Sequence, residues 1–113
     1  MKKENRVVVT GLGVVSSIGI GWKEFWNNLL AGKSGISKVE LFDTSKFNRH
    51  TGGEIKNFNP ADFIPAKMAK FIGRASAMAI AATKLALKDA KLTLAECRSQ
   101  EAGVIIGITM TES

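Results

Sequence analysis

Near its start the chain reads Arg6-Val7-Val8-Val9-Thr10-Gly11-Leu12-Gly13, and this stretch indicates the fold class. Its β-branched run does not alternate between apolar and polar side chains, which is typical of a strand covered on both faces in a parallel α/β sheet. A second run of this kind, Gly103–Ile108, lies near the other end of the sequence. Because parallel strands need a crossover connection, we expect these two runs to be neighbouring parallel strands of an α/β fold.

Two helix patterns lie between the runs. In residues 22–30 the apolar side chains recur at the spacing of one helix face, and Gly32 is expected to end that helix. The stronger pattern covers Ala66–Ala90, where many alanines favour helix and permit close packing. We expect this segment to be mainly helical and packed on both strands, with Gly73 as the point where it would divide into two helices. A short strand at Glu54–Lys56 is expected in the loop-like segment before it.

These elements do not form a complete sheet by themselves. Strands of this type must be covered on both faces, and a two-stranded sheet is marginal alone. The 113 residues offer few helices for that purpose. We therefore expect residues 1–113 to be a single partial domain, with the remaining cover supplied by sequence outside this chain.

The composition narrows the class of protein. Sixteen basic and ten acidic residues give a net charge of +6, which favours an acidic partner: nucleic acid, an anionic membrane or an acidic protein. Cys97 and His50 are the single residues of their types, too few for a disulfide framework or for a zinc site with about four ligands. No apolar stretch approaches the roughly 18 residues of a membrane span, and the start does not fit a signal peptide, so a cytoplasmic location is expected.

The motifs for catalysis and cofactor binding are weak. Gly11-Leu12-Gly13 follows a strand as a dinucleotide fingerprint would, but Ser16 replaces the third glycine and no acidic residue follows at the required distance. We interpret it as a turn that needs small residues, and we expect no cofactor. Cys97 lies in a polar segment, interpreted as a connecting loop, and neither it nor His50 has a recognisable catalytic partner. Neither residue is expected to be catalytic.

A basic stripe lies on the long helical segment. Lys67, Lys70 and Arg74 recur at helical spacing with no acidic residue among them. One interpretation is a solvated helix face, which is common. The other is a docking patch for an anionic partner.

Several segments, taken in order, resemble the start of the elongating β-ketoacyl-acyl-carrier-protein synthases. They are "RVVVTGLGVVSSIGIGWKEFWNNLLAGKSGI", "FDTSKF", "GGEIKNFNP", "RASAMAIAATKLALKDAKL" and "GVIIGITMTES". The resemblance covers essentially the whole chain. It implies a thiolase fold, in which two similar α/β halves pack as five layers, usually in a homodimer.

The resemblance also implies a reaction. These enzymes join an acyl group, held as a thioester on a cysteine, to malonyl-acyl-carrier protein with decarboxylation. In the family's order the catalytic Cys, the two His and a nearby Lys all lie beyond Ser113. The resemblance therefore implies no catalytic residue and no metal in this chain, and the isolated 113 residues are expected to be inactive.

Two binding roles carry over from the family. Basic residues that bind acyl carrier protein lie in the segment matching Lys67, Lys70 and Arg74. Met110 matches a hydrophobic residue that lines or gates the acyl-binding site. The sequence "GITMTES" departs from the glycine-rich "GSGIGG" of common members, so acyl length and subfamily stay open.

Two other classes of protein remain as alternatives. One is a non-catalytic relative of the chain-length-factor type, which keeps the fold and lacks the cysteine. The other is a small basic module that binds nucleic acid or a protein. Against the second stand the absence of an aromatic-plus-basic surface pattern and the buried type of the strands, so we expect no nucleic acid partner.

Overall fold

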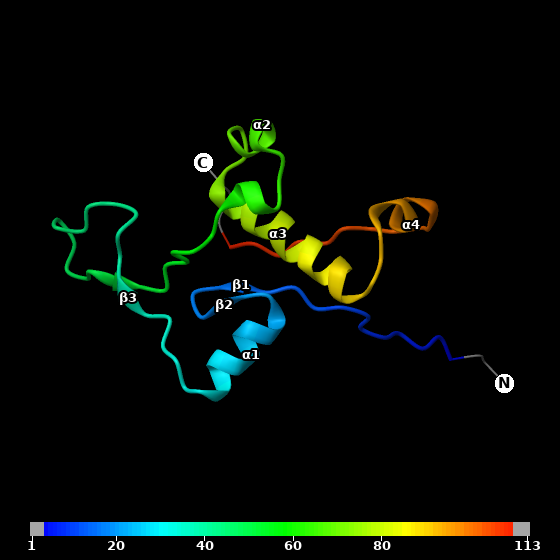
Figure 1. The fold of residues 1–113 in the computed structure, drawn as a ribbon, viewed down its shortest axis with the longest axis horizontal. Helices are drawn as coiled ribbons and strands as arrows, with labels where there is room; N and C mark the ends of the chain where they lie inside the picture. The colour runs from blue at the N-terminus through cyan, green and yellow to red at the C-terminus, as the bar shows by residue number, and fades with distance from the viewer. Residues whose placement is uncertain (1–3, 110–113) are drawn as a thin grey trace.

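The computed structural model describes residues 4–109, and Figure 1 shows a long central helix with the other elements arranged around it. The radius of gyration is 17.3 Å, larger than the roughly 13 Å of a compact chain of about 100 residues, so the structure is open. The elements in order are β1 (Val15–Ser16), β2 (Gly19–Ile20), α1 (Trp22–Leu30), β3 (Ser37–Lys38), β4 (Thr51–Gly52), η1 (a 3-10 turn, Pro60–Asp62), α2 (Ala66–Ala69), α3 (Arg74–Asp89) and α4 (Leu94–Ser99).

The two predicted helical segments are confirmed. The first is α1, and Gly32 follows it with φ of 66°, a left-handed conformation that suits glycine. The second consists of α2 and α3, separated at Gly73, whose backbone is extended. At the far end of α3, Lys91 has φ of 57° and the N–H of Leu92 donates to the carbonyl of Leu87, which closes the helix.

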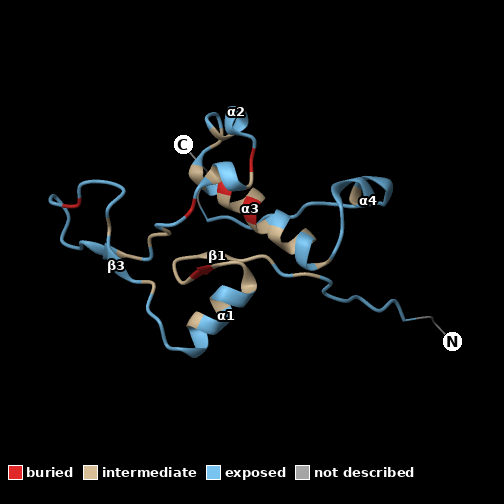
Figure 2. Ribbon diagram, in the orientation of Figure 1, coloured by how far each residue is buried: buried red, intermediate tan, exposed pale blue. Residues whose placement is uncertain are grey.

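The core is small and lies on one side of α3. It comprises Phe58, Ile64, Ala77 and Ala81, with exposed fractions of 6% or less. Figure 2 shows these buried positions on the first half of α3 and on the chain segment beside it. Alanines on α3 allow the loop that carries Phe58 to approach the helix closely.

Gly11 and Gly13 allow a second close approach to α3. A Cβ at Gly11 would lie 2.3 Å from the carbonyl oxygen of Ala86, and one at Gly13 would lie 1.8 Å from that of Ala82. Neither distance leaves room for any side chain. The need for small residues in this turn, predicted from the sequence, therefore comes from contact with helix backbone.

The predicted parallel pair of strands is not present among residues 4–109. Residues 6–13 and 103–108 are extended but belong to no strand, and all four strands are two-residue segments in antiparallel pairs. Val7 and Ile105 are 94% and 98% exposed. A strand of this type forms only when neighbouring strands satisfy its backbone and other elements cover its side chains. Both segments run in the same direction, opposite to α3 (Figure 1).

Two local predictions were wrong. No strand forms at Glu54–Lys56; the strand is β4, which pairs with β3. Cys97 lies on helix α4 and not in a loop. The helix begins with a capping box, in which Thr93 Oγ1 accepts from the N–H of Glu96 at 3.2 Å and the Glu96 carboxylate accepts from the N–H of Thr93 at 2.7 Å.

Candidate functional site

The predicted basic stripe divides into two parts in the structure. Lys67 lies on α2 and Lys70 directly follows that helix. Both are exposed, and neither takes part in an ion pair within residues 4–109. Their ammonium groups are available to an anionic partner.

Arg74, the third residue of the stripe, is engaged elsewhere. It is the first residue of α3 and is half-buried. Its Nη2 donates to the carbonyl of Ile55, and its guanidinium lies 5.6 Å from the centroid of the Phe58 ring. The structure therefore turns Arg74 toward the preceding loop and does not present it as an exposed charge.

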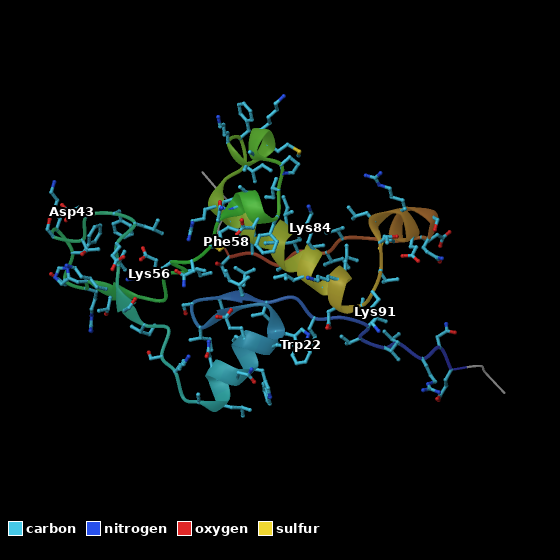
Figure 3. The ribbon with its side chains drawn as sticks, viewed as in Figure 1. Trp22, Asp43, Lys56, Phe58, Lys84 and Lys91 are labelled. Atoms are coloured by element: carbon cyan, nitrogen blue, oxygen red, sulfur yellow. The ribbon has the colours of Figure 1, made fainter. Side chains whose placement is uncertain are left out.

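The segment from Ile55 to Phe63, which includes η1, is held to α3 by aromatic and polar contacts that the sequence did not indicate. Phe58 and Phe63 stack with centroids 6.0 Å apart, and Lys84 Nζ donates to the carbonyl of Phe63. Figure 3 shows Phe58 beside α3, the helix that carries Lys84. The signal in the sequence was the pair of phenylalanines at positions 58 and 63.

Asp89, at the end of α3, joins three segments. Its carboxylate accepts from the N–H of Leu12 at 2.9 Å and from the indole N–H of Trp22 at 2.7 Å. The bond from Leu12, and after it the bond from Trp22, hold the pKa of Asp89 below its ordinary value. This carboxylate fixes the start of α1 and the glycine turn against the end of α3.

An apolar groove runs along another face of α3. Helix residues such as Ile80 and Leu87 form one wall, and Val104, Ile106 and Ile108 form the other. The three wall residues of the extended segment are each more than 60% exposed. Among the described residues that line the groove, Lys84 is the single titratable one, so the groove offers a mainly apolar surface without an acid–base pair.

Cys97 and His50 are not brought together. Cys97 is on α4, while His50 directly precedes β4, which pairs with β3; these elements lie at opposite ends of the molecule in Figure 1. His50 Nδ1 lies 3.2 Å from Thr44 Oγ1, its hydrogen-bond partner. Among residues 4–109 no group of three or more His, Cys, Asp or Glu could hold a metal ion.

Met110 lies outside the described residues, so its predicted place beside an acyl chain is not visible. In the described part of the chain, no helix is long and apolar enough to cross a membrane.

The sequence model of the family described as "Beta-ketoacyl synthase, N-terminal domain" matches residues 4–113 of this chain. The chain belongs to the β-ketoacyl synthase family. The resemblance found in the sequence is thereby confirmed, and an independent small basic module is not supported.

Individual relatives agree with this assignment. The chain is 42% identical over 107 residues to 3-oxoacyl-[acyl-carrier-protein] synthase 2 of Staphylococcus aureus (strain COL), covering 95% of this chain and 26% of that protein. It is 39% identical over 105 residues to the Synechocystis protein of the same name, covering 93% and 25%. The chain spans about a quarter of the length of these β-ketoacyl synthases.

A solved structure is also similar. It is described as the ishigamide ketosynthase/chain length factor, with a TM-score of 0.70 and 39% identity over 79% of this chain and 22% of that one. The chain is therefore similar in fold to a ketosynthase, and it contains both helices and strands. The parallel strand arrangement is not visible in residues 4–109.

Proposed function

We propose that this chain is the amino-terminal part of a condensing enzyme. The full-length enzyme would join an acyl thioester to malonyl-acyl-carrier protein in fatty acid or related polyketide-type elongation. The malonyl Cα forms a carbon–carbon bond with the acyl carbonyl carbon, the cysteine thiolate leaves, and the malonyl carboxylate departs as carbon dioxide. The observation that carries this proposal is the 42% identity to a 3-oxoacyl-[acyl-carrier-protein] synthase over 95% of the chain.

Within this reaction the chain would act in binding and in support of the fold, not in bond formation. We infer that no catalytic residue lies in it, because Cys97 and His50 are far apart and have no matching partner. The cationic segment containing Lys67, Lys70 and Arg74 would form the surface for the acidic carrier protein, with Lys67 and Lys70 as its exposed charges. Met110 would gate the acyl site. The full-length enzyme would be a cytoplasmic homodimer.

A second candidate is a chain-length-factor-like subunit without condensing activity. It is favoured by the similarity to a structure described as a ketosynthase/chain length factor. Such a subunit would keep the same fold and the same contacts around α3. Residues 4–109 carry no feature that separates the two candidates.

Assay of the full-length protein separates them. Purified protein is mixed with acyl and malonyl carrier-protein substrates, and formation of the 3-oxoacyl product is followed together with carbon dioxide release. A condensing enzyme forms both products in equal amounts by itself. A chain-length-factor-like protein forms neither alone, and its addition changes the product length of a catalytic partner.

The same assay on the isolated 113 residues tests the inference that this chain contains no catalytic residue. They are expected to form no product under the same conditions. Condensation by this chain that is lost in Cys97→Ala would contradict the assignment of the chemistry to other parts of the protein.

A further inference from the structure

Two cationic side chains of α3 fasten the loop formed by residues 55–63, which includes η1, to the helix. Arg74 donates to the carbonyl of Ile55, and Lys84, further along α3, donates to the carbonyl of Phe63. Between these points Phe58 is buried under the Arg74 guanidinium and against the Phe63 ring. The loop is therefore held at both ends by charge-assisted hydrogen bonds and in the middle by aromatic contact.

Helix α2 depends on this fastened loop for its position. It follows η1 after a short connection and packs against it. Ile64, in the connection, is buried in the core, and Ala69 and Ile72 pack against the same core. Lys67 on this short helix and Lys70 directly after it are both exposed, next to residues that pack against η1 and the core.

The guanidinium nitrogen of Arg74 that donates to the loop cannot bind an external anion at the same time. An arginine binds an anionic group through its planar fork of N–H donors. Here Nη2 of the fork donates to the Ile55 carbonyl, and the guanidinium lies over the Phe58 ring. Turning outward would remove the charged donor from that carbonyl and the cation from the aromatic ring.

We propose that Arg74 is a positioning residue, which fastens the loop to α3 and so orients Lys67 and Lys70, while these two lysines make the electrostatic contact with the carrier protein. The second half of this inference rests on the proposed function. The first half rests on the contacts of Arg74 alone.

The first experiment measures steady-state kinetics of the full-length protein with carrier-bound substrate and with a pantetheine thioester. Lys67→Ala/Lys70→Ala is expected to raise KM for the carrier-bound substrate several-fold with little change in kcat, and to leave the pantetheine thioester nearly unaffected. Arg74→Met is expected to raise KM in the same selective way. Added to the double variant, it should change KM by less than about twofold, because it acts through the same lysines. A full multiplicative effect would show that Arg74 docks directly and would overturn the inference.

Conservative replacement provides an independent test. Arg74→Lys keeps the charge but loses the planar fork that reaches the Ile55 carbonyl and stacks on Phe58. The positioning role predicts that it behaves like Arg74→Met. Restoration of the original KM by lysine would mean that charge alone matters, and would overturn the inference. Arg98→Met, at an exposed arginine of α4, is the matched control and should leave KM unchanged.

Hydrogen exchange separates failure of this inference from failure of the proposed function. Arg74→Met should accelerate amide exchange in residues 55–71, while Lys67→Ala/Lys70→Ala should not. Unchanged exchange in Arg74→Met would overturn the positioning role. Accelerated exchange together with an unchanged KM in the double lysine variant would instead keep the fastening role and overturn carrier docking at these lysines.

Discussion

Replacement of Gly13 by alanine tests the close approach of the amino-terminal segment to α3. A Cβ at this position would lie 1.8 Å from the carbonyl oxygen of Ala82 and 2.7 Å from the backbone nitrogen of Ala86. Ordinary contact begins at 3.4 Å, so the segment would have to withdraw by about 1.6 Å. The obstructing atoms belong to helix backbone, which cannot rotate away as a side chain can.

The expected cost follows from this geometry. Overpacking typically costs about 1–3 kcal/mol, and the backbone obstruction puts Gly13→Ala at the upper end, about 2–3 kcal/mol. A withdrawal larger than 1 Å also forfeits a large share of the dispersion energy across the contact. In the full-length protein, urea unfolding followed by circular dichroism should show a lower midpoint with an unchanged slope.

Gly53→Ala is the matched control. Its Cβ would meet its nearest atom at 3.5 Å, which is ordinary contact, so we expect a change within about 0.5 kcal/mol. Equal midpoints for Gly13→Ala and the unmodified protein would refute the close approach. Equal loss in both variants would refute the explanation by contact with α3.

Three further perturbations have expected outcomes. Lys91→Gly should raise the free energy of unfolding by about 0.5–1 kcal/mol in urea titration, because it relieves a left-handed backbone at φ of 57°; destabilisation would contradict this. Phe58→Ala should lower it by about 3–5 kcal/mol, and a loss below 1 kcal/mol would exclude Phe58 from the core. The pKa of Asp89 is lowered on folding, so its contribution is present above the unfolded pKa of about 3.9 and is lost as pH falls through the lower folded pKa. Asp89→Asn should therefore lower the urea midpoint at pH 7, with the difference shrinking below about pH 4; a constant difference would refute the role of its charge.

Much of the candidate site was beyond prediction from the sequence. Spacing alone placed Lys67, Lys70 and Arg74 on one stripe, since all three fall within a helical pattern. The helical pattern breaks at Gly73, and Arg74 is the first residue of a new helix, α3. Arg74 is therefore separated from Lys67 and Lys70. Its partner Ile55 is 19 residues away, at a separation that helical periodicity does not relate.

The sequence by itself determined the local elements and the family. Apolar periodicity and punctuating glycines specify α1, α3 and the division at Gly73, because these depend on neighbours within a few residues. Only the tertiary structure showed which cationic side chains are exposed and which form hydrogen bonds within the chain. It also gave the reason for glycine at positions 11 and 13, which is close contact with the backbone of α3. It also decided that the apolar runs at 6–13 and 103–108 remain extended and unpaired here. A strand forms only when another strand pairs with its backbone N–H and C=O groups. A run of β-branched residues favours a strand but does not provide that second strand.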